Sequence, residues 1–259
     1  MVSRRSVLRA TLGFCSCAAY GAGSCATHWN AARADQSTHI RGRGFELHYV
    51  GAQRDTVVNG KVAAAIDLRS LATTPFVYGL GPVAELRGEV TIVNGRPSLS
   101  RVGPDGKVQV AESFEAGAPF LVWAEVPSWR EIPIPAEVRS FADLEAFAPR
   151  AAEQVGLDPK QPFPFLVRGR QDLIDFHILN RVGDEPHNAE KHRKIQVPFE
   201  LTQVEAVVVG FHSPAHRGVF IPMDSAIHIH FQTLDNTASG HIQSLKIGPG
   251  ATLSLPQGI

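Results

Sequence analysis

Three histidines lie close together near the end of the chain. His228 and His230 alternate with apolar residues in the β-rich run Ile227–Phe231. Because successive side chains of a strand point to opposite faces, these two imidazoles share one face, about 7 Å apart. The turn-rich segment 232–240 predicts a return as a neighbouring antiparallel strand, which brings His241 beside the pair.

Three neutral imidazoles without a thiolate are typical of a catalytic zinc site, since structural zinc sites usually have four ligands rich in cysteine. The cysteines of the chain all fall within its first 25 residues. Taken alone, the pair His228 and His230 is equally consistent with half-exposed strand residues that bind nothing. The third histidine, His241, behind a hairpin favours a metal site with an open position, and the expected metal is zinc.

Composition excludes some partners. The 259 residues include 25 basic and 25 acidic side chains, and 44% of the residues are hydrophobic. Because these charges cancel and no long stretch concentrates one sign, we expect no binding to nucleic acid or to an anionic membrane. No segment after the N-terminal region approaches the ~18 apolar residues of a membrane span. A small-molecule partner is expected, and a homodimer is an open alternative.

The N-terminus resembles an export signal. Residues 1–34 contain the pair Arg4-Arg5, a mildly apolar run 10–26 and the sequence Ala32-Arg33-Ala34, which fits a cleavage site. This pattern is typical of a twin-arginine signal peptide and predicts a periplasmic protein. Two alternatives are a lipoprotein modified at Cys25 and a plain amphipathic or disordered tail.

The first half of the chain is predicted to be mainly sheet. Apolar runs followed by Asn-Gly dipeptides at 59–60 and 94–95 predict two hairpins, and residues 120–126 predict a buried strand. A single helix is expected from Ser140 to Val155. It begins with a capping box formed by Ser140 and Asp143, carries an apolar stripe at helical spacing and ends at Gly156.

The second half returns to sheet. Strands are predicted at 165–168 and 173–179, a polar loop at 181–194, further β structure at 195–211 and a final hairpin at 227–247. Length alone leaves the number of domains open, and two subdomains are consistent with it.

The histidine segment resembles the zinc segment of the acetolactate decarboxylase family. In that family His-x-His-Phe follows an apolar residue, and a turn leads to Gly-Gly-His or a close variant. Here the corresponding runs are Ala226–Phe231 and Gly240–Ile242. Upstream, Gly79–Pro82 and Leu86–Thr91 resemble the family's Gly-x-Gly and Leu-x-Gly-Glu hairpin. The order of these blocks agrees, so the resemblance covers most of residues 45–256.

The resemblance implies a fold and a site. The fold is α+β, mainly β, with two packed subdomains of mixed or antiparallel sheet and few helices. We expect an N-terminal mainly β subdomain with one helix at 35–160 and a C-terminal β subdomain with the metal site at 161–259. The implied zinc ligands are His228, His230 and His241. The implied active-site carboxyl is Glu89. Without the resemblance, its position near a turn would favour an ordinary surface charge.

Two positions depart from the family pattern. His177 stands where an active-site arginine is expected, and a family carboxylate after Leu-Pro has no counterpart in Leu255–Ile259. A cation normally orients the substrate's carboxylate. His177 is therefore a candidate catalytic residue that needs a proton to act in this way, and Arg168, Arg170 and Arg181 are alternatives.

The resemblance implies a carbon–carbon lyase. The expected reaction is zinc-dependent decarboxylation of 2-acetolactate (2-hydroxy-2-methyl-3-oxobutanoate), a 2-hydroxy-3-oxo acid, to acetoin and CO₂, with Glu89 as proton donor. The alternative is a divergent zinc-binding family member that acts on, or merely binds, a different small ligand in the periplasm. Predicted export favours the alternative, because acetolactate is made inside cells, whereas the presence of Glu89 favours the lyase.

Overall fold

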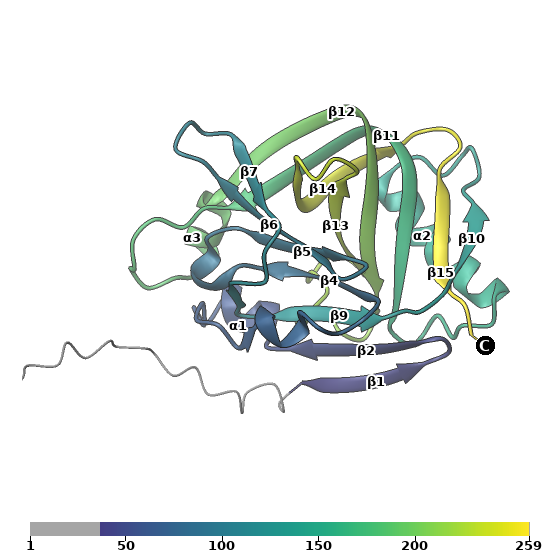
Figure 1. Cartoon of the computed structure of the whole chain (residues 1–259), viewed down its shortest axis with the longest axis horizontal. Helices are drawn as coiled ribbons and strands as arrows, with labels where there is room; N and C mark the ends of the chain where they lie inside the picture. The colour runs from purple at the N-terminus through teal and green to yellow at the C-terminus, as the bar shows by residue number, and fades with distance from the viewer. Residues whose placement is uncertain (1–36, 259) are drawn as a thin grey trace, which may run out of the picture. The chain divides into compact units, whose positions relative to one another are not determined.

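The computed structural model describes residues 37–258, and the predicted signal peptide lies outside them. Two large sheets dominate this part of the chain (Figure 1). All pairings between their strands are antiparallel, and the fold is mainly β with few helices, as predicted.

The first sheet has seven strands drawn from the N-terminal half. Antiparallel neighbours follow one another in the spatial order β1 (Thr38–Gly42), β2 (Phe45–Val50), β9 (Leu121–Glu125), β4 (Val77–Pro82), β5 (Glu89–Val93), β6 (Arg96–Val102) and β7 (Val108–Ala111). A separate two-stranded sheet joins β3 (Ile66–Asp67) to β8 (Gly117–Ala118).

The second sheet has six strands and carries the histidines. Its order is β10 (Trp129–Pro133), β15 (Thr252–Pro256), β11 (Phe163–Leu179), β12 (Gln196–His212), β13 (Ile227–Thr233) and β14 (Ser239–Ile247). Because β14 also pairs with β11, the four strands from β11 to β14 close into a ring. Figure 1 shows β11 and β12 as long, bent strands whose upright parts stand beside the crosswise β2, β4 and β9.

One large apolar core joins the two sheets. Its buried members include Leu47, Leu80 and Val122 from the first sheet and Phe165, Phe176 and Phe231 from the second. A smaller apolar cluster on the first sheet includes Val90, Ile92 and Trp123. Since the larger core is shared, the division into subdomains at residue 160 stays a prediction.

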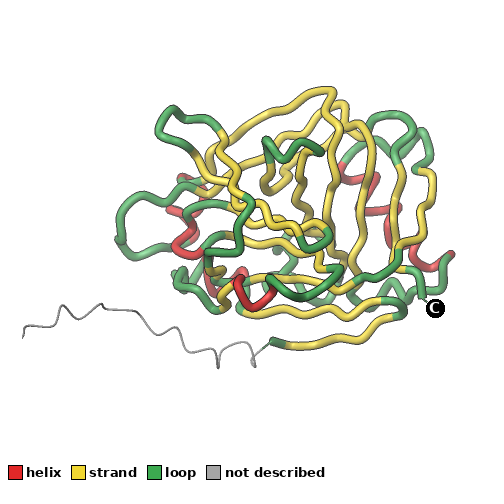
Figure 2. Tube along the Cα trace, in the orientation of Figure 1, coloured by secondary structure: helices red, strands yellow, loops and turns green. Residues whose placement is uncertain are grey.

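The predicted helix is confirmed as α2 (Phe141–Gln154) (Figure 2). The Ser140 side chain accepts a hydrogen bond from the Asp143 backbone N–H, and the Asp143 carboxylate accepts one from the Ser140 N–H. This capping box satisfies N–H groups that a helix leaves free at its first turn. The apolar face buries Leu144 and Ala151, and Gly156 follows with φ +82°.

Two local predictions are wrong, the first because of contacts between distant segments and the second because a local helix cap was overlooked. The hairpin expected at Asn59-Gly60 is absent, and the preceding residues form the short helix α1 (Gln53–Val57). Its first two N–H groups donate to the carbonyls of Gly218 and Val219, partners remote in sequence. The loop expected at 181–194 ends in helix α3 (Ala189–Lys194), which the Asn188 side chain caps by accepting from the Lys191 N–H.

Other turns follow the sequence more closely. The Asn94-Gly95 hairpin is confirmed, with φ +50° and +76° at its two turn residues. The strands predicted at 165–168 and 173–179 are both present as parts of one strand, β11. Gly169 lies within this strand and has a φ of +117°, which residues with a side chain rarely adopt. A Cβ atom at this position would also lie only 3.2 Å from Ala251 Cα. Glycine therefore allows the strand to continue through this point.

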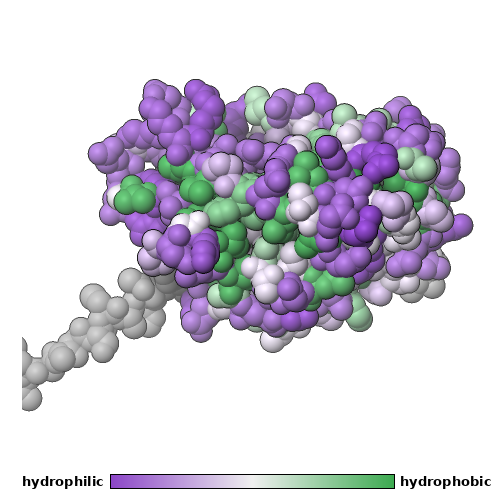
Figure 3. Space-filling view, turned by 90° about the horizontal axis from the view of Figure 1, so that it is seen from above, coloured by the Kyte–Doolittle hydropathy of each residue, from purple (hydrophilic) through white to green (hydrophobic). Residues whose placement is uncertain are grey.

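Polar residues cover much of the face shown in Figure 3, with apolar residues gathered in smaller patches. Among residues 37–258, no helix has the length and apolar character needed to cross a membrane.

Candidate metal and catalytic site

The structure brings the three predicted metal ligands together. His228 and His230 alternate on β13, and His241 on β14 is the direct cross-strand partner of His230. One donor atom from each residue lies within 4.8 Å of the other two, and Nε2 of His228 is 3.0 Å from Nδ1 of His241. The predicted hairpin is therefore confirmed, and it brings the three histidines together.

The contacts around the histidines orient their rings. His228 Nδ1 lies 2.8 Å from the Phe220 carbonyl, and His230 Nδ1 lies 3.2 Å from Thr91 Oγ1. Hydrogen bonds at these Nδ1 atoms leave both Nε2 atoms facing the cluster, which is how metal-ligating histidines are usually held. His230 Nε2 is buried and has no hydrogen-bond partner among the described residues.

Burial keeps the cluster uncharged. It lowers the pKa of His228 to about 4 and the pKa values of His230 and His241 well below the ordinary value. Neutral imidazoles present free lone pairs, as metal binding requires. An unpartnered buried nitrogen among three neutral rings fits a metal ion, so this group could hold one.

Glu89 lies beside the histidines, at the start of β5. It is only 2% exposed, and its Oε2 is 4.0 Å from His230 Nε2. Burial raises the pKa of this carboxyl well above its ordinary value, against a smaller lowering by a backbone hydrogen bond at Leu179. Both shifts favour the uncharged forms, so burial disfavours an ion pair between Glu89 and His230.

His177 also lies at this site. It pairs in register with His241, and its Nε2 is 3.9 Å from Glu89 Oε1. Burial, with smaller contributions from His192 and His228, lowers the pKa of His177 to about 3. At neutral pH the ring carries no charge, so it does not supply the cation expected at this position. Its part in catalysis stays a prediction.

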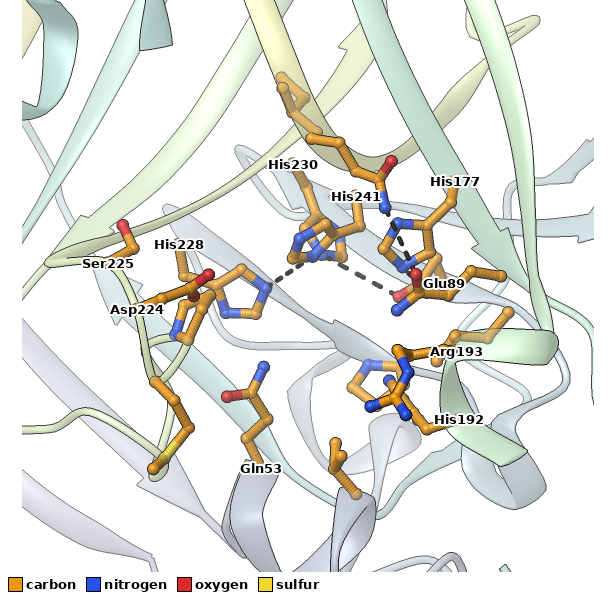
Figure 4. Close-up of a pocket in the computed structure, with 18 of the residues that line it drawn as sticks. Gln53, Glu89, His177, His192, Arg193, Asp224, Ser225, His228, His230 and His241 are labelled. Atoms are coloured by element: carbon orange, nitrogen blue, oxygen red, sulfur yellow. Dashed lines mark hydrogen bonds and ion pairs between the residues drawn. The ribbon is translucent and has the colours of Figure 1, made fainter. Parts of the chain in front are cut away.

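These side chains line one cavity of about 830 Å³ (Figure 4). Its walls come mainly from β5, β11, β13, β14, the helices α1, α2 and α3, and the segment 222–225. The volume is within the ~300–1,000 Å³ usual for small-molecule sites. Besides Glu89, the carboxylates lining it are Glu145 and Asp224, and Glu145 accepts hydrogen bonds from the Ser225 hydroxyl and the Ala226 N–H.

The basic side chains that line the cavity are not those considered from the sequence. Arg181 is 2.8 Å from Glu85 and Arg170 is 3.4 Å from Asp172, and neither they nor Arg168 line the cavity. The arginines that do are Arg54 of α1 and Arg193 of α3. Figure 4 shows Arg193 and His192 reaching from α3 into the cavity that holds the histidines and Glu89.

Sequence reasoning missed Arg193 because it placed residues 181–194 in a loop. One usable signal was the basic run Lys191–Lys194, which begins three residues after Asn188, a favoured helix N-cap. Even with the helix identified, the sequence would not have placed it over the cavity.

Comparison with known proteins agrees with this fold. The family model for alpha-acetolactate decarboxylase matches residues 39–257. A Staphylococcus aureus protein of unknown function, described as similar to alpha-acetolactate decarboxylase, has a TM-score of 0.66 and 13% identity. That match covers 82% of this chain and 85% of the other.

Alpha-acetolactate decarboxylase from Bacillus subtilis strain 168 has a TM-score of 0.63 and 16% identity, over 82% of this chain and 86% of that one. No curated protein matches the sequence. The solved structures share the fold, and the family model spans nearly all of the described residues. The chain therefore belongs to the alpha-acetolactate decarboxylase family.

Proposed function

We propose that this protein is a zinc-dependent carboxy-lyase that converts 2-acetolactate, a 2-hydroxy-3-oxo acid, to acetoin and CO₂. The observation that carries the proposal is the meeting of three neutral histidines and one buried carboxyl group, Glu89, in a single cavity. Membership of the family supports the same reaction.

His228, His230 and His241 would hold the zinc ion. Three imidazoles without a thiolate form the ligand set of many catalytic zinc sites, which keep a position open for substrate. When bound, zinc supplies Lewis-acid stabilisation of the negative charge that remains on the substrate's oxygens after CO₂ leaves.

Glu89 is the proposed proton donor. When CO₂ leaves, the electron pair of the broken carbon–carbon bond stays on carbon 2 of the substrate. The neighbouring ketone delocalises this pair, which gives an enediolate. Carbon 2 must then take up one proton to form the hydroxyketone. Glu89 is the carboxyl group nearest the histidines, with oxygens 3.9 Å from His177 and 4.0 Å from His230. It can deliver that proton and regain one from water, a step worth ~10²-fold or more in rate.

Arg193 is the proposed anchor for the substrate's carboxylate. It lines the cavity, and no acidic side chain pairs with it among residues 37–258. Its neighbours on α3 are engaged, since Lys191 lies 3.0 Å from Glu185 and Lys194 lies 2.7 Å from Glu190. A guanidinium group can bind a carboxylate through two parallel hydrogen bonds, and this one is free to do so.

A second candidate function is binding or conversion of a different small ligand at the same zinc site. The observation that favours it is the neutral His177, which lies beside Glu89 where the family resemblance leads us to expect an arginine. A ligand without a carboxylate would not need a cation at that position.

The test combines metal content with acetoin formation from racemic acetolactate, using the full chain and its Glu89→Gln variant. We expect one zinc ion at the histidine cluster in both proteins. Wild-type protein should form acetoin, and Glu89→Gln should lose at least ~10²-fold in kcat. Zinc without turnover in the wild type would refute the lyase and favour the second candidate. Full activity in Glu89→Gln would refute the assigned proton donor.

A further inference from the structure

A second group of possible metal ligands lies at the edge of the seven-stranded sheet, on β1, β2 and β9. We call His39, Glu46, His48 and Glu125 the edge cluster. His39 pairs in register with His48, and Glu46 pairs with Glu125. Because side chains two residues apart on a strand share a face, all four point to one side of the sheet.

The donor atoms of the edge cluster converge. His39 Nε2 lies 3.5 Å from Glu46 Oε2, and His48 Nε2 lies 3.6 Å from Glu125 Oε1. One donor atom from each of His39, Glu46 and His48 lies within 4.8 Å of the other two. Nε2 of His48 is buried and has no hydrogen-bond partner among residues 37–258.

Ring stacking holds the central histidine in place. His48 lies between His39 and Trp123, with centroid distances of 4.7 and 5.2 Å and interplanar angles of 7° and 11°. The side chain of His48 is 17% exposed, whereas that of His39 is 39% exposed and less confined by packing. One ligand is therefore fixed in advance and the other can adjust.

The charges of the cluster also favour a cation. Glu46 and Glu125 are direct cross-strand partners, and like charges in that position destabilise a sheet. Besides the two histidines, Arg41 contacts these carboxylates, with its Nε 3.2 Å from Glu46 Oε1.

We propose that the edge cluster binds one divalent transition-metal ion through His39, Glu46 and His48, with Glu125 in reach as a fourth ligand. Two imidazoles with carboxylates suit zinc, nickel or copper(II), whereas magnesium and calcium prefer oxygen ligands alone. The ion ties the edge strand β1 to β2 and β9. This site is separate from the histidine cluster of the cavity and does not depend on the proposed lyase activity.

Zinc titration of the full chain by calorimetry, after removal of metal with a chelator, tests the proposal. We expect two equivalents for the wild type and one each for His39→Ala and Glu46→Gln. His241→Ala, at the cavity, should lose the other equivalent. Arg41→Ala is the matched control on the same strand face: it should retain both equivalents and bind the edge ion more tightly, because a competitor for Glu46 is gone.

Two equivalents in both His39→Ala and Glu46→Gln would overturn the proposal, as would a single wild-type equivalent that His241→Ala abolishes. Circular dichroism checks that each variant is folded. If His39→Ala does not fold, Glu46→Gln alone tests the edge cluster. Acetoin formation separates the two proposals. A protein with two zinc equivalents and no turnover refutes the lyase and leaves the edge site intact.

Fluorescence gives a second readout. The Trp123 ring stacks on His48, so copper(II) bound at the edge cluster should quench its emission. The quenching should disappear in His39→Ala and persist in His241→Ala. Equal quenching in wild type and His39→Ala would contradict a site at the edge cluster.

Discussion

Replacing Arg193 by alanine tests how the cavity recognises its substrate. If Arg193 anchors the substrate's carboxylate, the change removes a charge-assisted hydrogen-bonded pair, which contributes about 1.5–3 kcal/mol. Arg193 is exposed, so water and salt screen the pair and the low end of that range applies. Because 1.4 kcal/mol corresponds to a factor of ten, we expect KM for acetolactate to rise about tenfold.

The rate constant distinguishes anchoring from a structural effect. An interaction made equally in the ground state and the transition state changes KM and leaves kcat nearly unchanged. Arg193→Lys should fall between wild type and alanine, since an ammonium group lacks the planar fork of a guanidinium. Inhibition by acetoin, which has no carboxylate, should be the same in all three proteins.

Steady-state acetoin formation gives these constants. Lys194→Ala is the matched control, because it removes the next basic residue of α3, which is paired with Glu190 and does not line the cavity. Unchanged KM in Arg193→Ala, or an equal rise in Lys194→Ala, would refute the anchoring role. The same loss of affinity for acetoin would refute it too. Arg54 of α1, the other arginine lining the cavity, would then be tested by Arg54→Ala.

Three further predictions concern metal, helix and pH. Removing the proposed zinc ion with a chelator should abolish acetoin formation, and adding zinc back should restore it. The melting temperature should fall and recover in parallel, because a metal that binds the folded chain more tightly than the unfolded chain stabilises the fold. Activity that survives complete zinc removal would contradict the proposal. Ser140→Ala should lower the free energy of unfolding by about 1 kcal/mol in urea titrations, since α2 loses its N-cap, and an unchanged midpoint would argue against that cap. In zinc-free protein, burial lowers the pKa of His177 to about 3 and that of His192 to about 4. As the pH falls, the unfolded chain therefore takes up protons on these two histidines before the folded chain does. Stability should therefore be fully present above about pH 6.5 and fall as the pH drops toward 3, and constant stability over that range would refute this assignment.

The histidine cluster was predictable because its assembly is local. Strand alternation places His228 and His230 on one face, and a short turn returns His241 to them, so two simple rules fix the geometry. The capping box of α2 is local in the same way. Glu89, in contrast, entered only through the family resemblance, since nothing in its own segment points to a buried carboxyl group.

The remaining parts of the site depend on contacts between distant segments. Helix α1 forms where β-branched residues favour a strand, because the carbonyls of Gly218 and Val219 accept hydrogen bonds from its first turn. Arg193 reaches the cavity only through the placement of α3. The low pKa of His177 likewise arises from burial by the whole fold rather than from its neighbours in sequence.

The placement of the cavity residues on two sheets has a consequence for the order of assembly. The three histidines lie within one hairpin, whereas His230 meets Thr91 across 139 residues of chain, and Glu89 comes from that same distant strand. Contacts of short sequence separation form faster than those that must close long loops. During refolding, the three histidines can therefore come together on the β13–β14 hairpin before the first sheet docks and brings the carboxyl group. On the function proposed above, the metal would bind at the first of these stages and turnover would begin only at the second. Metal uptake and gain of activity would then be two separate events in refolding, the first insensitive to changes in the first sheet.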